Sequence, residues 1–211
     1  MKLKVGIPAV FLLALACVFA AVPASAGVVV YDNTGPGSYT ANAWSIFDNG
    51  GGAYTVTDSF TLSSTAIVEG ANFYVWLLPG DSLTSVNWTI TDTAFGTSIE
   101  TGTAAGEPET QVATAFGYYP VLEESISIPP TVALAPGTYW FQLSEGLDAY
   151  DNNVWWDESD GPSIAYATGG LGQIPSETFQ IIGTPEPSSF LLLGLGMLAL
   201  AGLATRRKLL A

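Results

Sequence analysis

The sequence predicts an all-β fold, an antiparallel β-sandwich or jelly roll, for the long central part of this 211-residue chain. Three observations predict it. Short stretches alternate apolar and polar residues, which is the period of a half-buried strand. Glycine and proline clusters separate these stretches at short intervals. No central stretch has the 3.6-residue apolar period of an amphipathic helix. Residues 27–183 are long enough for one domain with its own core, and we expect them to form a single sandwich, the body of the protein.

Each strand of the body follows from its pattern. Residues 27–32 (GVVVYD) give a first strand, and residues 53–62 alternate, with Phe60 and Leu62 on one face. Residues 67–78 are apolar on both faces at their end, which predicts a central strand. Residues 85–91 place apolar and small polar side chains on opposite faces. The remaining strands are expected over residues 98–103, 122–128, 131–134, 137–143, 153–157, 163–167 and 177–182.

Two stretches of the body lack a strand pattern. Residues 101–114 (TGTAAGEPETQVAT) predict a long loop, and residues 178–189 predict a linker, with the last strand ending near Gly183. Turn residues divide the rest of the body, at positions 35–37, 50–52, 79–81, 136–137, 161–162 and 169–170.

The N-terminus has the three parts of a secretory signal peptide. Lys2 and Lys4 form a positive start, and an apolar run reaches about residue 21. Ala24 and Ala26 then provide a small-residue cleavage site before Gly27. We expect residues 1–26 to be removed by cleavage after Ala26. A lipoprotein signal acylated at Cys17 is the rival interpretation; it fits less well, because the apolar run continues beyond the cysteine.

The C-terminus predicts a membrane helix. Residues 188–204 are 17 residues of mostly leucine, glycine and alanine, about 26 Å long as a helix at 1.5 Å per residue. That is just below the roughly 30 Å of a bilayer core. The cations Arg206, Arg207 and Lys208, in a basic tail over residues 205–211, are expected to stay on the cytoplasmic side. With a cleaved N-terminal signal, the body is then exported through the inner membrane.

The triplet Pro185-Glu186-Pro187, the apolar run and the three cations occur in a fixed order. Residues 184–211 thereby resemble the PEP-CTERM sorting signal of Gram-negative bacteria, a tail also described as the ice-binding-protein C-terminal domain. The resemblance implies that an exosortase, a membrane protease-transpeptidase, cuts near the triplet, and that the product reaches the cell surface or an exopolysaccharide matrix. Without the resemblance, the tail predicts a plain single-span anchor.

All basic residues lie at the two ends. Between Gly27 and Thr184 there is no Lys, Arg, His or Cys, whereas 18 of the 19 acids are there, so this span carries 0 − 18 = −18. Nucleic-acid binding is excluded, because phosphates need cations. A His- or Cys-based catalytic pair, a Schiff-base lysine and a His-ligated zinc are also excluded. Carboxylates, hydroxyls, amides and aromatic rings remain, and they suit glycan binding and Ca²⁺ coordination.

The stretch DAYDNNVWWDESDGPS, residues 148–163, has the densest oxygen chemistry. Its acids are candidate Ca²⁺ ligands, although their spacing is not that of an EF-hand loop: Asp148, Asp151, Asp157, Glu158 and Asp160. A strand between two acidic loops is the simpler interpretation, and a glycosidase carboxylate pair is the third. We name no cofactor as certain.

Tryptophan is the candidate for glycan stacking. Trp155 and Trp156 are adjacent, so on a strand they point to opposite faces and only one belongs to the core. Trp76 and Trp140 are out of phase with their apolar neighbours, so an exposed pair there would form a sugar platform. The segments SFTLSS, WLLPGDS, GTYWFQLSE and VWWDESDGPSIAY also resemble exported domains that precede PEP-CTERM tails. That resemblance implies a sandwich and no catalytic residues.

Together these observations predict an exported, acidic, all-β protein with a structural or adhesive role and no enzymatic activity. We expect it to be held briefly in the inner membrane, cut by an exosortase, and associated with exopolysaccharide or the cell-surface matrix. One alternative is a glycan-binding module, with Ca²⁺ bridging it to an anionic polysaccharide. The second is a glycoside hydrolase that uses only carboxylates. A row of exposed aromatic side chains on one sheet face would favour the glycan-binding module.

Overall fold

A computed structural model describes residues 27–35, 39, 41–47, 54–106, 110–131, 133–185 and 196. Every regular element within residues 27–185 is a β-strand, and every pairing between named strands is antiparallel, which confirms the all-β prediction. The predicted signal peptide lies outside the described residues, as does the predicted membrane helix apart from residue 196. Among the residues that are described, no helix has the length and apolarity needed to cross a bilayer.

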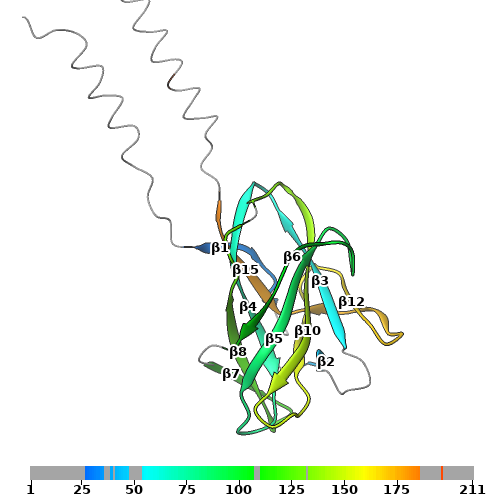
Figure 1. Cartoon of the computed structure of the whole chain (residues 1–211). Helices are drawn as coiled ribbons and strands as arrows, with labels where there is room; N and C mark the ends of the chain where they lie inside the picture. Colours follow the sequence, from blue (N-terminus) through cyan, green and yellow to red (C-terminus); the bar gives the residue numbers. More distant parts are fainter. Residues whose placement is uncertain are drawn as a thin grey trace, which may run out of the picture.

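The strands form two sheets (Figure 1). The nine-stranded sheet follows the path β1 (Val28–Asp32), β15 (Phe179–Pro185), β4 (Ala66–Trp76), β11 (Trp155–Ser159) and β14 (Ser176–Glu177). Four more strands join it, namely β2 (Ala43–Ser45) on β11, β8 (Tyr119–Ser127) and β9 (Ala133–Leu134) on β4, and β7 (Thr110–Ala115) on β8. The six-stranded sheet has the order β13 (Gly172–Ile174), β12 (Ala165–Ala167), β3 (Thr55–Leu62), β10 (Gly137–Asp148), β5 (Leu83–Thr91) and β6 (Ser98–Ala105).

The two sheets enclose one apolar core, to which both contribute alternate residues. In β5 the predicted inward residues Val86, Trp88 and Ile90 are all buried. β4 pairs on both of its sides, as expected for the central strand. Its end is apolar on both faces because Phe73 and Val75 pack in the core while Trp76 packs in a second apolar cluster on the other face. At the centre, the ring of Phe141 from the six-stranded sheet lies 5.8 Å from that of Trp156 in the nine-stranded sheet.

Three expectations about irregular segments are wrong. The stretch 101–114 contains the end of β6 and most of β7, because polar, threonine-rich strands can pair at a sheet edge without apolar alternation. The short strands β2 and β13 lie where no strand was expected. The predicted linker begins inside the fold: β15 continues to Pro185, which pairs with Ala66 of β4.

The last strand holds the start of the C-terminal motif. Val28 of β1 pairs with Gly183 of β15, so the first and last strands of the body lie side by side at one edge of the sandwich (Figure 1). The Thr184 hydroxyl donates a hydrogen bond of 2.8 Å to a carboxylate oxygen of Glu69. Pro185, the first residue of the Pro-Glu-Pro triplet, therefore lies exposed at the end of a strand that pairs with the N-terminal strand.

Candidate functional site: the outer-face aromatic cluster

A second apolar cluster lies on the outer face of the nine-stranded sheet, opposite the core. Alternate residues of β4 separate the two clusters, because Phe73 and Val75 point into the core while Tyr74 and Trp76 point outward. Around them lie side chains from β2, β7, β8, β11 and the segment before β2. We call the aromatic members the outer-face aromatic cluster: Tyr39, Tyr74, Trp76, Phe116, Tyr118, Tyr119 and Trp155.

Trp76 lies at the centre of this cluster. Its ring is nearly parallel to that of Tyr119, with centroids 6.2 Å apart, and meets Phe116 edge-on at 5.5 Å. Trp155 pairs with Trp76 across the strands and packs edge-on against Tyr119 at 5.7 Å. Such contacts fix the ring orientations, each contributing about 0.5–1.5 kcal/mol beyond burial. The result is a closely packed group of aromatic rings on the outer face of the sheet.

The exposed rings of the cluster come from the turn between β7 and β8. Phe116 is 71% exposed and Tyr118 is 56% exposed. Phe116 (φ 49°) and Gly117 (φ 67°) both have left-handed backbone conformations, which suits the tight turns that join antiparallel strands. This strained turn holds two large aromatic side chains in solvent beside the partly buried Tyr119. An exposed apolar group of this kind is typical of a binding surface.

Asp157 accepts hydrogen bonds from two members of the cluster on its buried side. One of its carboxylate oxygens accepts a 2.5 Å hydrogen bond from the indole N–H of Trp76. The other accepts hydrogen bonds of 2.7 Å from the Tyr39 backbone N–H and the Thr178 hydroxyl. Burial raises the pKa of Asp157 to about 6, although these three hydrogen bonds lower it. Asp157 therefore positions Trp76 and Tyr39 and is not itself accessible to a ligand.

Polar side chains border the cluster on the same outer face. Glu123 of β8 lies opposite Tyr74 and accepts a 3.2 Å hydrogen bond from its hydroxyl. The next row contains Asn72, which donates to Gln180 at 3.4 Å and accepts from Ser125 at 3.0 Å. We call Asn72, Glu123, Ser125 and Gln180 the polar strip. Aromatic rings next to amide, hydroxyl and carboxylate groups provide stacking and hydrogen bonding on one surface.

The four tryptophans predicted for glycan stacking are divided by the fold. Trp155 and Trp76 come together in the outer-face cluster, although Trp76 is only 5% exposed and serves as its base. Trp156 is fully buried in the core while Trp155 lies on the outer face, so the prediction that only one of the two belongs to the core is confirmed. Trp140 is on β10 of the other sheet, where it packs against Tyr166. Trp76 and Trp140 therefore do not form one platform.

The five acids predicted as Ca²⁺ ligands are also dispersed. Asp148 caps the turn after β10, accepting from the backbone N–H groups of Tyr150 and Asn152 at 3.0 and 2.7 Å. Asp157 lies under Trp76, and Glu158, next along β11, accepts from Trp44 at 3.3 Å. Asp151 and Asp160 are exposed. Within the described part of the chain, no three such side chains group closely enough to hold a metal ion.

A pair of acids faces inward at one end of the core. Asp58 of β3 and Glu177 of β14 are both fully buried. Burial raises the pKa of Asp58 to about 6, and burial together with the nearby charge of Asp58 raises that of Glu177 well above its usual value. A glycosidase pair would need such carboxyls to line a cleft open to a sugar chain. These two instead lie inside the packed sandwich.

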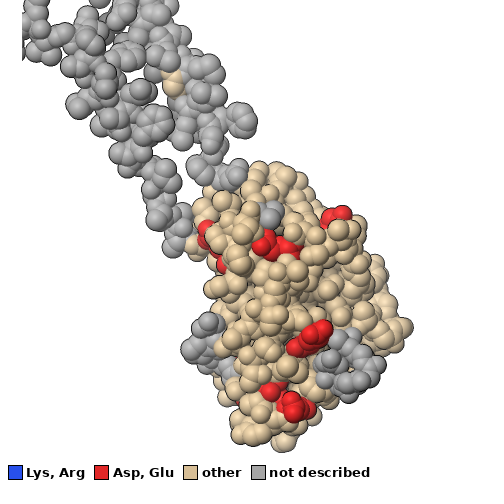
Figure 2. Space-filling model, viewed as in Figure 1, with Lys and Arg blue, Asp and Glu red and all other residues tan. Residues whose placement is uncertain are grey.

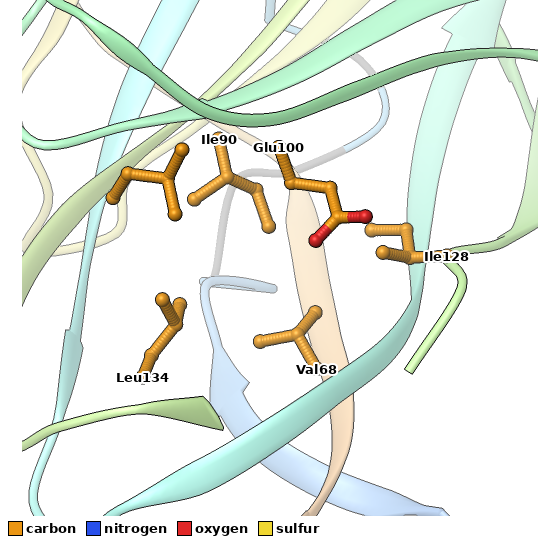
Figure 3. Close-up of a pocket in the computed structure, with 6 residues that line it drawn as sticks. Val68, Ile90, Glu100, Ile128 and Leu134 are labelled. Carbon is orange, nitrogen blue, oxygen red and sulfur yellow. The ribbon is translucent and has the colours of Figure 1, made fainter. Parts of the chain in front are cut away.

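The recess shown in Figure 3 is also small. Apolar side chains of both sheets line it, with Ile90 on one side and Val68 and Leu134 on the other. Its volume is about 10 Å³, room for about one water molecule. At its rim the Glu100 carboxylate accepts a hydrogen bond from the Thr131 hydroxyl. The recess is too small for a sugar ring, which leaves the outer-face aromatic cluster as the candidate site.

On the face seen in Figure 2, the acidic groups are separated and form no continuous patch. No described residue is basic. Five cluster members lie outside the sequence-based candidates: Tyr39, Tyr74, Phe116, Tyr118 and Tyr119. Three of them, Phe116, Tyr118 and Tyr119, have a local signal. The signal in the sequence was the string FGYY at residues 116–119, where a Gly between aromatic residues is typical of an exposed turn.

Comparison with known proteins identifies the C-terminal segment. The family model described as "PEP-CTERM protein-sorting motif" matches residues 184–208. No curated protein shows significant similarity to the chain. The match begins at Thr184, within β15, and includes the Pro-Glu-Pro triplet and all three C-terminal cations. Signals of this family are processed by exosortase, so the match indicates an exported protein with a membrane-anchored sorting signal.

Proposed function

We propose that this chain, which carries a PEP-CTERM sorting signal, is a non-enzymatic protein of the cell surface or biofilm matrix that binds exopolysaccharide through its outer-face aromatic cluster. The sorting signal supports delivery to the cell exterior. The observation that carries the binding role is the group of rings packed over one sheet face, to which the β7–β8 turn adds two rings that are more than half exposed. Sugar rings present apolar C–H faces to such aromatic surfaces, while their hydroxyls match the polar strip.

The position of the sorting signal supports the same function. Pro185 ends the last strand, and four residues, Glu186 to Ser189, separate it from the apolar run at Phe190. Four extended residues span at most about 14 Å. Before cutting, the folded body is therefore held close to the membrane surface, and the aromatic cluster becomes available to a distant polysaccharide after exosortase has acted.

A matched pair of double variants tests the binding role. Phe116→Ala with Tyr118→Ala removes the two exposed rings, and we expect the affinity for the producing cell's exopolysaccharide to fall about tenfold or more, at about 0.5–1.5 kcal/mol per ring contact. Binding of the exported protein to immobilised exopolysaccharide measures this.

The control is Phe95→Ala with Tyr150→Ala, which removes two rings that are 42% and 70% exposed but lie outside the cluster. Phe95 also has a positive φ, 52°, so the backbone strain at Phe116 is matched. The control should bind like the unchanged protein. Equal losses in both double variants, or no binding by the unchanged protein, would count against a glycan site at the cluster.

A further inference from the structure

The charges around the outer-face aromatic cluster indicate which glycans it selects. Glu123 is half-buried beside Tyr74, and Asp157 lies directly behind Trp76. Between Gly27 and Pro185 no cation is present to neutralise either carboxylate. The faces of Tyr and Trp rings carry negative electrostatic potential, which attracts cations placed over them. Both the rings and the acids therefore favour positive charge.

Glu123 is the acid available to a ligand. Its carboxylate accepts the hydrogen bond of the Tyr74 hydroxyl, and the Tyr74 ring packs against that of Tyr39 with centroids 4.9 Å apart, so the carboxylate lies at the edge of a tyrosine pair on the outer face. Aromatic rings together with a carboxylate form the arrangement that recognises organic ammonium groups. An anionic polysaccharide would meet a body of charge −18 with no bridging cation in the protein, which disfavours it.

We propose that the outer-face aromatic cluster selects a polysaccharide that carries protonated amines, that is, an amino-sugar polymer with free amino groups. The sugar rings stack on Phe116, Tyr118 and Tyr119, and an ammonium group pairs with Glu123 at the edge of the Tyr39–Tyr74 pair. This inference rests on the proposed glycan-binding function and deepens it by naming the ligand class.

The test compares two oligosaccharides that differ only at nitrogen, a glucosamine oligomer and the matching N-acetylglucosamine oligomer. At mildly acidic pH and low salt, we expect the exported protein to bind the glucosamine oligomer about tenfold more tightly, because only that oligomer adds an ion pair with cation–π support to the stacking of its sugar rings. High salt should reduce that preference.

Glu123→Gln keeps an acceptor for the Tyr74 hydroxyl. It should remove most of the preference for the glucosamine oligomer while leaving the affinity for the N-acetylglucosamine oligomer unchanged.

The outcomes separate the inference from the proposed function. Equal binding of both oligomers, or a preference that Glu123→Gln does not change, overturns the selection for amines while the glycan site stands. Binding of neither oligomer counts against both. Polylysine is the third probe, and if it binds as tightly as the glucosamine oligomer with the same loss in Glu123→Gln, the partner is a basic protein segment and the proposal is overturned.

Discussion

Replacing Asn33 with leucine is expected to lower the free energy of unfolding by about 3 kcal/mol, because it removes an amide that reaches the buried acid pair from the loop after β1. The Asn33 side-chain nitrogen lies 2.6 Å from both the Ser176 hydroxyl and the Glu177 carbonyl oxygen. It also lies 2.7 Å from the Ser163 hydroxyl and 3.4 Å from an Asp58 carboxylate oxygen. One neutral amide thus contacts four oxygens inside the core.

The cost of this variant follows from the composition of the body. A buried carboxylate is usually paired with a cation, and here none exists between Gly27 and Pro185. Asp58 depends on N–H and O–H donors, among them the Glu177 backbone N–H at 2.7 Å and the Ser163 hydroxyl at 2.8 Å. Leucine has a similar size but donates nothing, so the surrounding oxygens lose the two N–H groups of the amide with little change in volume.

Urea unfolding followed by tryptophan fluorescence measures the Asn33→Leu effect, and Asn87→Leu is the matched control. Asn87 is partly exposed on β5 and makes two side-chain hydrogen bonds, of 2.7 Å to Glu145 and 2.6 Å from Thr103. Because water can replace those partners, the control should cost less than about 1 kcal/mol. A similar loss in both variants would show that the buried amide has no special role.

The stability of the body should fall as pH rises from about 4 to about 8, which is the reverse of the usual behaviour of salt-bridged carboxylates. Burial raises the pKa of Asp58 and of Asp157 to about 6 in the folded state, against about 3.9 in the unfolded chain. A raised pKa means that the folded protein binds protons that the unfolded chain has already released. Each group then contributes stability below about pH 4 that is lost as pH passes 6, on the order of 2–3 kcal/mol.

Glu177→Gln separates this effect from general charge repulsion. Burial and the charges of Asp58, Asp157 and Glu158 raise the pKa of Glu177, and neither of its carboxyl oxygens has a hydrogen-bond donor among the described residues. Glutamine has the same shape without the ionisation, so the variant should be more stable than the unchanged protein at pH 8 and show a shallower pH dependence.

Thermal unfolding across the pH range measures the Glu177→Gln effect, with Asp160→Asn as the control that removes an exposed acid. The control should keep the pH dependence of the unchanged protein. A stability that increases with pH, or a Glu177→Gln variant that is less stable at pH 8, would contradict the account of the buried acids.

Residue patterns predict the fold here better than they predict the sites. The alternation in β5 and the apolar end of β4 reveal the core because burial repeats with period two along a strand. Edge strands such as β6 and β7 are held by backbone hydrogen bonds to one neighbour, and their threonines and alanines carry little periodic signal. That is why a loop was expected where two strands lie.

The candidate site depends on contacts between distant residues. Trp155 and Trp76 are far apart in sequence and become neighbours only through the pairing of β11 with β4. Asp58 lies on β3 and Glu177 on β14, which belong to opposite sheets. The two acids therefore become neighbours only when the two sheets pack against each other. Sequence alone identifies the types of residue involved, aromatic rings and carboxyls in a body without cations. It does not reveal which of them face outward and which are enclosed.

Intact mass of the protein recovered from the cell surface and the medium tests most directly the claim that both ends are removed to leave a cation-free sandwich outside the cell. The predicted product begins at Gly27 and lacks the apolar run Phe190 to Ala204 and the basic residues after it. A recovered protein that retains the leucine-rich run, or a chain found only in the cytosol with its first 26 residues, would contradict the account.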